Sequence, residues 1–505
     1  MQRVLDKKMF IPIVLIGFLF VLCAKKPVKQ PKEIILARIG EKTISLNEFL
    51  RRAEYVPRPK YCRGNTGIHK KIVLNSLIAE KMLALEAGED NELTQNEHFQ
   101  RYLQGRKEQA MRQWLYYKEA VSKVKLEPAE IEKVYQVAGR KYKVYFFSVN
   151  DDSIAQEVKS KLHEQGKSFE QVFKELGGLD PLPEKEVEYN SWEHDVIHNA
   201  LFSKKLKVNE VIGPLKVEND LYIVMKVKSW TDRVALSEED IQQRWNNVRK
   251  RLTDSKALRI YENFVAKIMK GKKIEFVPST FRKLVNLVGP LYFELEEKRR
   301  EIFLNMALDK KLDNPKFLDL RKGLEDIRNE PFFRIDGEVW TVGDFEIELE
   351  KHPLVFRKKK MAKKELGEQF KFAIADMIRD KYLTQEAYKR GYDKVNVVKR
   401  NVEMWKDAYL ANYQKKKYLE RFKLEQKEGP QIIIKYLNPY IDQLQAKYND
   451  VIKINVEEFE KIKLTRIDMF VTQYNVPFPV VVPAFPQVTT DHKLDYGRRM
   501  ENVIP

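Results

Sequence analysis

Residues 73–87 read VLNSLIAEKMLALEA, and their apolar residues recur at the spacing of one helix face. The stripe consists of Leu74, Leu77, Ile78, Met82 and Leu85. A one-sided stripe of this kind predicts an amphipathic helix that packs one face into a core. The charged residues between the apolar ones are expected to face water, and they are Glu80, Lys81 and Glu86.

The same helix pattern returns 300 residues later, in FAIADMIRDKYLTQEA at 372–387. Five of the eleven positions from Leu77 are identical in the two stretches. A second match lies upstream at an offset of 296, where RIGEKTISLNEF (38–49) aligns with RIDGEVWTVGDF (334–345). Because an internal repeat constrains the whole fold, the sequence predicts two related helical modules.

The composition indicates a folded protein with several domains. The chain has 505 residues, 43% of them apolar and 11% aromatic, which is enough to fill real cores and excludes wholesale disorder. The net charge of +19 favours contact with acidic proteins, anionic lipid or nucleic acid. We expect mainly solvated helix faces and no nucleic-acid partner, since no arginine-rich arm, RNP-like motif or zinc finger accompanies the charge.

Residues 1–24 have the pattern of a signal peptide. Three basic residues precede an apolar run from Met9 to Leu22, which is too short to span a bilayer comfortably. The run ends at LFVLC and resembles a bacterial lipobox, which implies lipidation of Cys23, although Leu22 departs from the small residue preferred there. Cleavage after Ala24 and an uncleaved anchor are the alternatives. Each places the chain outside the cytoplasm, in the periplasm or cell envelope, with residues 25–33 as a basic tether.

The second cysteine, Cys62, then has no partner for an internal disulfide. Its surroundings, YCRGNTG, offer no base or oxyanion site for a nucleophile. We interpret Cys62 as a loop residue.

The predicted fold class is α+β and mainly helical, with two helical modules and an α/β domain inserted in the first. The expected segments are a first helical module (34–138), an α/β domain (139–232), the closing helix and strand of the first module (233–285), a helical connector (286–330), a second module (331–466) and a Pro-rich C-terminal arm (467–505). In both copies a helix, a turn and a short β pattern (IEF, IKI) follow the long helices, and we assign each closing part to its own copy.

Local signals refine this outline. Asn47 is expected to cap the first helix, and Pro290 and Pro315 are expected to break the connector helices. The arm contains prolines at 477, 479, 483 and 486, so it is expected to be extended. It is either a strap packed over the body or a docking segment for a partner.

The order of these segments resembles the extracytoplasmic parvulin-type foldases, the SurA- and PrsA-like chaperones. The matching stretches are ILARIGEKTISLNEFLRR (35–52 within the opening), the repeat helix, GKSFEQV, LKVNEVIGPLKV and YIVMKV. The resemblance covers roughly residues 34–285, and the repeat extends it to 331–462. It implies a chaperone module around a prolyl isomerase domain.

The resemblance also implies where an isomerase pocket would lie. The family's first histidine position falls near Val144 and its last on Tyr222, so neither histidine is present. Phe202 matches the aromatic position of the pocket, and Trp192 could line the same groove. We therefore expect a parvulin-like fold with a degenerate or absent isomerase site.

No cofactor or metal is expected. His194 and His198 could share a helix face, but a zinc site needs three or four ligands and no third ligand has suitable spacing. P-loop, GxGxxG, GxSxG and HExxH motifs are absent from the sequence.

Three functions remain open. The first is a membrane-tethered chaperone for unfolded exported or outer-membrane polypeptides, which would bind them by shallow apolar contact and basic steering. The second is an active peptidyl-prolyl isomerase. The third is a structural subunit of an envelope or secretion assembly that uses a chaperone-like fold.

Overall fold

The computed structural model describes residues 33–191, 193–217, 220–293, 315–358, 361–422, 429–464 and 476–500, together with Met469 and Gln473. The chain divides into residues 1–33 and 34–505. The signal peptide, Cys23 and most of the tether therefore lie outside the described residues. Within the described part, the predicted class is confirmed, because the chain is mainly helical and carries small, largely antiparallel sheets. None of the described helices combines the length and the apolar character needed to cross a membrane.

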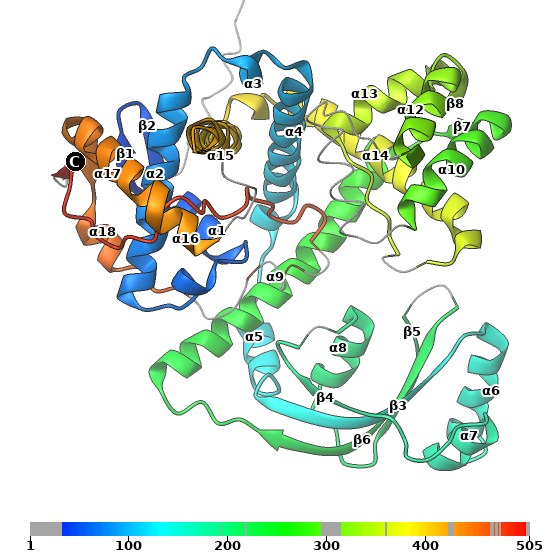
Figure 1. Ribbon diagram of the computed structural model, residues 1–505. Coiled ribbons are helices and arrows are strands. Elements are labelled where there is room, and N and C mark those ends of the chain that lie inside the picture. The colour runs from blue at the N-terminus through cyan, green and yellow to red at the C-terminus, as the bar shows by residue number, and fades with distance from the viewer. Residues whose placement is uncertain are drawn as a thin grey trace, which may run out of the picture. The chain divides into compact units, whose positions relative to one another are not determined.

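The first copy opens with a β-hairpin and continues with helices (Figure 1). Its elements are β1 (Ile35–Ile39), β2 (Lys42–Ser45), α1 (Leu46–Glu54), α2 (Gly67–Ala87), α3 (Glu92–Gln95) and α4 (Glu97–Glu119). The cap of α1 is Ser45, whose hydroxyl accepts from the backbone N–H of Glu48, so the assignment to Asn47 is wrong. The serine oxygen satisfies a helix N–H that has no partner within the helix.

An α/β block follows. The helix α5 (Pro128–Tyr135) leads into it, and the block itself contains β3 (Arg140–Val149), α6 (Asp152–His163), α7 (Phe169–Glu175), β4 (Glu184–Glu188), α8 (Asp195–Phe202), β5 (Val211–Lys216) and β6 (Tyr222–Asp232). The strands form one antiparallel sheet in the order β4-β3-β6-β5. One face of the sheet packs with α8 and α5, and the other with α6 and α7, so the block has two separate cores.

A long helix, α9 (Glu238–Met269), leads from the α/β block into the second copy. The elements that follow are β7 (Ile274–Phe276), α10 (Pro278–Tyr292), α12 (Pro315–Ile327), β8 (Pro331–Ile335), β9 (Glu338–Thr341), α13 (Val342–Lys351), α14 (Leu366–Lys389) and α15 (Asn396–Glu420). Pro290 does not end its helix, because α10 continues to Tyr292. The proline has no backbone N–H to donate to the preceding turn, and the helix ends two residues after it.

The C-terminal part contains α16 (Pro430–Ile432), a π-helical turn (Ile433–Leu437), α17 (Asn438–Tyr448), β10 (Ile452–Ile454), α18 (Val456–Glu460) and β11 (Arg498–Arg499). Residues 476–497 are otherwise extended, and we call residues 476–500 the strap. Phe478 packs against Tyr261, and the carbonyl of Ala484 accepts from Arg52 Nη2 at 3.0 Å. Phe485 and Val488 are buried in the core of the first copy. These contacts fit the strap interpretation of the arm.

The closing strands are exchanged between the copies. The expectation that the strand in 233–285 closes the first module is wrong, because β7 pairs with β8 and places Glu275 opposite Arg334. The first copy is closed by β10 instead, with Lys453 opposite Arg38. The patterns IEF and IKI are nearly equivalent three-residue strands, so the local sequence does not specify which hairpin each strand joins.

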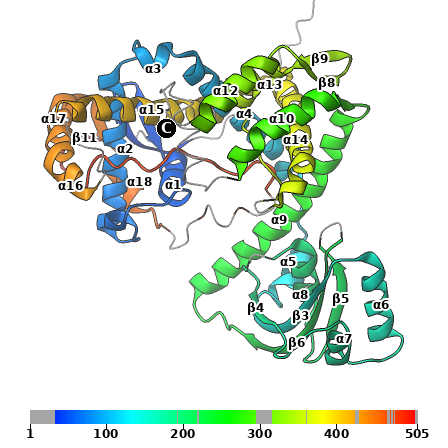
Figure 2. The ribbon, with the colours of Figure 1, turned by 45° about the vertical axis from the view of Figure 1, so that its right-hand side comes forward.

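The long helices are exchanged in the same way. α15, which follows α14 in the chain, packs along α2, whereas α4, which follows α2, packs along α13 and α14. Both ribbon views show α15 between α2 and α4 (Figures 1 and 2). Each copy therefore completes the other, and the two copies form one interlocked unit that we call the helical body.

Buried ion pairs hold α2 to α1 and to the exchanged helix α15. The Lys81 ammonium lies 2.7 Å from Glu48 and 2.9 Å from Asp407 on α15. Glu80 accepts two 2.7 Å hydrogen bonds from the Arg52 guanidinium. The prediction that Glu80 and Lys81 face water is therefore wrong, because α15 and α1 cover the face they occupy and supply the opposite charges.

Candidate functional site

The predicted isomerase pocket is not assembled. Val144 on β3 and Phe202 on α8 are both fully buried in the core on the α8 face of the sheet. Tyr222 at the start of β6 packs with the opposite core, beside α6 and α7. Trp192 lies outside the described residues. Since side chains on opposite faces of one sheet cannot line one pocket, Tyr222 cannot act with Val144 and Phe202.

Tyr222 instead ties three elements of the block together. Its hydroxyl donates to Asp152 Oδ1 at the start of α6, and Lys216 Nζ on β5 lies 3.2 Å from the same oxygen. The hydrogen bond from Tyr222, followed by that from Lys216, lowers the pKa of the Asp152 carboxyl. This arrangement holds the Asp152 carboxylate in place between two hydrogen-bond donors.

The two histidines of α8 have structural contacts. His194 Nδ1 accepts from the backbone N–H of Val196 and caps the helix. His198 is buried, with Nε2 2.9 Å from the carbonyl of Tyr189, and burial lowers its pKa to about 4. Among the described residues, no three His, Cys, Asp or Glu side chains lie close enough to hold a metal ion.

Cys62 is also not a reactive group. It lies in a short 3₁₀ turn (Lys60–Cys62) rather than an open loop, and its side chain is buried in the core of the first copy. Burial raises the pKa of the Cys62 thiol to about 12. A thiol this far from ionisation is a poor nucleophile.

A groove lies where α1, α4 and α15 meet, with a volume of about 220 Å³. We call it the α4–α15 groove. Its lining residues are Asn47 and Arg51 from α1, Ala110, Gln113, Trp114 and Tyr117 from α4, and Val397 and Asn401 from α15. The four residues of α4 share one helix face, since they are spaced by three, one and three positions. The groove exists only because α15 of the second copy packs beside α4 of the first.

Two stacked aromatic rings dominate this groove. The rings of Trp114 and Tyr117 lie 5.3 Å apart with an interplanar angle of 27°, and Tyr117 is 45% exposed. The indole N–H of Trp114 is buried and has no acceptor among the described residues. At the rim, Gln113 Nε2 donates to the carbonyl of Pro479 in the strap at 2.7 Å. The groove therefore presents apolar rings and an amide that already binds an extended, proline-containing segment.

The sequence did not predict this groove. Trp114 lies in residues 97–121, where apolar residues at helical spacing indicate a helix face packed in a core. Val397 and Asn401 carried no signal of their own, because their approach to α4 follows from the helix exchange.

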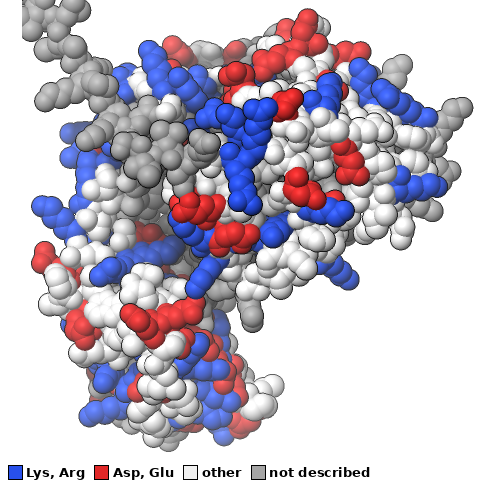
Figure 3. Space-filling view, turned by 90° about the vertical axis from the view of Figure 1, so that its left-hand side faces the viewer, with Lys and Arg blue, Asp and Glu red and all other residues white. Residues whose placement is uncertain are grey.

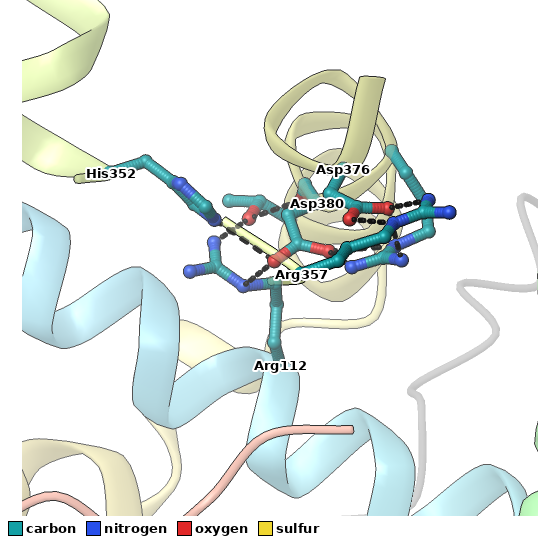
Figure 4. A network of polar contacts seen from close by, with 7 residues as sticks. Arg112, His352, Arg357, Asp376 and Asp380 are labelled. Atoms are coloured by element: carbon teal, nitrogen blue, oxygen red, sulfur yellow. Dashed lines mark hydrogen bonds and ion pairs between the residues drawn. The ribbon is translucent and has the colours of Figure 1, made fainter. Parts of the chain in front are cut away.

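A buried ionic network joins the copies at a second place (Figure 4). Asp380 on α14 lies 2.9 Å from His352 Nε2 and accepts from Arg379 Nη2 at 2.7 Å. Arg112 on α4 lies 3.7 Å from Asp380 and donates to Thr384 at 2.7 Å. These contacts link α4 to α14, so we assign the network to holding the two helices together. Two of its buried nitrogens, Arg112 Nε and His352 Nδ1, have no hydrogen-bond partner among the described residues.

The surface charge is mixed. Figure 3 shows one face, on which lysine and arginine side chains are spread among acidic and uncharged ones. Several cations pair locally, such as Lys250 with Asp254 and Lys161 with Glu157. This pattern is typical of solvated helix faces, as expected from the composition.

Comparison with known proteins gave one structural match. No family model matches the sequence, and no curated protein matches it. Among solved structures, the chain is similar to the foldase protein PrsA from Streptococcus pneumoniae str. Canada MDR_19A. The match has 15% identity, covers 44% of this chain and 91% of that one, and has a TM-score of 0.18. This TM-score is too low to establish a common fold, so the proposals below stand on the residues of this chain.

Proposed function

We propose that this protein is an extracytoplasmic, membrane-tethered chaperone that binds unfolded exported polypeptides in the α4–α15 groove. The observation that carries the proposal is the partly exposed pair of stacked rings, Trp114 and Tyr117. They lie in a groove that residues of both copies line. Stacked aromatic rings offer large apolar contact without demanding one sequence, which suits varied unfolded clients.

The strap supports the choice of ligand. Its residues Pro477–Phe478–Pro479 lie beside the groove, and the carbonyl of Pro479 is bound by Gln113. An extended client strand has the same backbone groups as the strap, and its apolar side chains can reach Tyr117. Nearby cations, including Arg51 at the groove and Lys118 beside Trp114, favour clients with acidic flanks.

The α/β block has a different role in this proposal. Its α8 face is filled by apolar side chains, and Tyr222 is on the other face, so no described group there could desolvate and twist a prolyl amide. We infer that the block is a degenerate relative of an isomerase domain. An assay with a prolyl peptide should show no acceleration of cis–trans exchange above the uncatalysed rate. Acceleration that is lost on substitution of Phe202 or Tyr222 would contradict this inference.

The groove is tested by Tyr117→Ser. The variant should raise the dissociation constant for an unfolded envelope protein about tenfold, the loss typical of an important interface aromatic. Ile68→Ser, at an apolar residue of α2 that is at least as exposed as Tyr117, is the matched control and should bind like the unmodified protein. Binding is measured by fluorescence titration, together with suppression of client aggregation.

Two outcomes would reject the proposal. Equal losses in both variants would mean that any exposed apolar residue contributes and that the groove is not the site. No suppression of aggregation by the unmodified protein, together with capture of one stoichiometric partner, would favour a structural subunit of an envelope assembly.

A further inference from the structure

A row of cations crosses the first copy's sheet on its outer face. This sheet has the strand order β11-β10-β1-β2. Arg38 on β1 lies opposite Lys453 on β10, and Lys453 lies opposite Arg498 on β11. All three side chains are exposed, whereas Ala37, Ile39, Ile452 and Ile454 of the same strands are buried in the core. We call Arg38, Lys453 and Arg498 the cation row.

The members of the row are close together. Adjacent strands are about 4.8 Å apart, so the Cα atoms of Arg38 and Arg498 are separated by about 10 Å. Like charges directly opposite each other on neighbouring strands repel and destabilise the pairing. A folded sheet that places three cations in register therefore has a cost that nothing inside the sheet offsets.

Little negative charge compensates the row. Arg498 lies 3.1 Å from Asp450, but both side chains are largely exposed, and such pairs contribute little. Neither Arg38 nor Lys453 has a carboxylate within ion-pair distance among the residues that the structure describes.

Protection of a sheet edge does not explain the row. Charged side chains on edge strands discourage pairing with other chains. Arg38 and Lys453 are on β1 and β10, which are the two central strands of this sheet. We therefore interpret their charges as a binding site for an anion outside the protein.

The position of the row in the chain indicates which anion. Arg38 comes five residues after Glu33, where the predicted tether ends, and the tether sequence KKPVKQPKE contains four lysines. In the sequence, Arg38 thus follows closely on a basic segment that, under the proposed function, leads to the membrane anchor. A membrane leaflet rich in anionic lipid attracts such clusters, with about a fivefold gain in binding for each cation near the surface.

We propose that the outer face of the β11-β10-β1-β2 sheet docks on anionic lipid headgroups of the membrane to which the tether leads. The cation row contacts the headgroup phosphates, and this contact orients the helical body on the membrane. The inference rests on the proposed membrane tether and is independent of client binding in the groove.

The test is co-sedimentation of the full chain with vesicles of phosphatidylcholine alone or with phosphatidylglycerol added. The readout is the ratio of the two binding constants, which removes any charge-independent insertion of the N-terminal segment. Arg38→Glu with Lys453→Glu should lower this ratio by at least tenfold in low salt. The control, Lys159→Glu with Lys205→Glu on the α/β block, makes the same change in net charge and should leave the ratio unchanged.

The milder pair Arg38→Gln with Lys453→Gln should lower the ratio less. It should also raise the thermal unfolding midpoint slightly, because it removes the repulsion between opposed cations. Equal losses in the row variant and the control would overturn the proposal in favour of net charge alone. Equal binding of the unmodified protein to both kinds of vesicle would also overturn the proposal. If the unmodified protein and the control then bound to a polyglutamate column and the row variant did not, the row would be assigned to acidic polypeptides. Suppression of aggregation without vesicles should be the same in all variants, so failure of the chaperone function is seen separately.

Discussion

Asp380 illustrates how single residues hold the two copies together. Burial alone would raise the pKa of its carboxyl, but His352, Arg112 and Arg379 outweigh burial and hold the pKa below the ordinary value. A carboxyl with a depressed pKa in the folded state stabilises the protein above its unfolded-state pKa of about 3.9. That stabilisation is lost as the pH falls through the folded-state value.

Asp380→Asn should therefore destabilise the protein in a pH-dependent way. At pH 7 we expect a loss of about 3–5 kcal/mol, because the variant leaves the buried Arg112 cation without its counter-charge. The difference in unfolding free energy between the two proteins should be constant above about pH 5 and shrink below about pH 4. Urea unfolding followed by circular dichroism measures it, and a difference that stays constant down to pH 2 would contradict the assigned charge state.

At the scale of elements, the helix exchange depends on one close contact. Gly105 on α4 is buried, and a Cβ built there would lie 2.1 Å from the backbone oxygen of Lys351 at the end of α13. No side chain can move aside to relieve a clash with backbone. Only glycine allows α4 of the first copy to approach α13 of the second this closely.

Gly105→Ala should destabilise the protein by about 1–3 kcal/mol, although alanine is the better helix former by about 1 kcal/mol. Gly367→Ala in α14 is the control, since the nearest atom to its added Cβ is 3.9 Å away. The control should be neutral or slightly stabilising. If thermal unfolding shows the same small gain for both variants, α4 does not contact α13 as described.

The strand exchange is tested by engineered cysteine pairs. Cysteines at Glu275 and Arg334 should form a disulfide, because directly opposed residues of an antiparallel pair lie within bridging distance. The pair at Arg38 and Lys453 should also cross-link. Cysteines at Arg38 and Glu275 should not form a disulfide. They would lie together only if β7 closed the first module, as the sequence predicted. Mobility on non-reducing gels distinguishes the cross-linked from the uncross-linked protein. A cross-link between cysteines at Arg38 and Glu275 would mean that β7 closes the first module.

The sequence predicted elements better than it predicted their partners. The spacing of Leu74, Leu77 and Ile78 was sufficient to predict α2, and the repeat predicted α14, because helix periodicity is a local property. The partners of Glu80 and Lys81 were missed, because Arg52 reaches Glu80 only when α1 packs on α2, and Asp407 reaches Lys81 only after the long helices exchange. The groove was missed for the same reason, and the candidate pocket residues Val144 and Tyr222 could be assigned to opposite sheet faces only from the strand register.

At the scale of the whole molecule, the α/β block is an insertion with adjacent ends. Arg140 at the start of β3 lies opposite Asp232 at the end of β6. The carbonyl of Gly139 also accepts from the backbone N–H of Arg233 at 2.8 Å. The chain thus enters and leaves the block at neighbouring points, and a short linker can replace it while α5 and α9 keep their places.

The central claim is that client binding belongs to the helical body and not to the α/β block. Its most direct test is to replace residues 140–232 by a short Gly-Ser linker and measure suppression of aggregation of an unfolded envelope protein. We predict that the shortened protein keeps most of the activity and that Tyr117→Ser within it reduces the activity further. A folded shortened protein that has lost the activity and no longer responds to Tyr117→Ser would contradict the account.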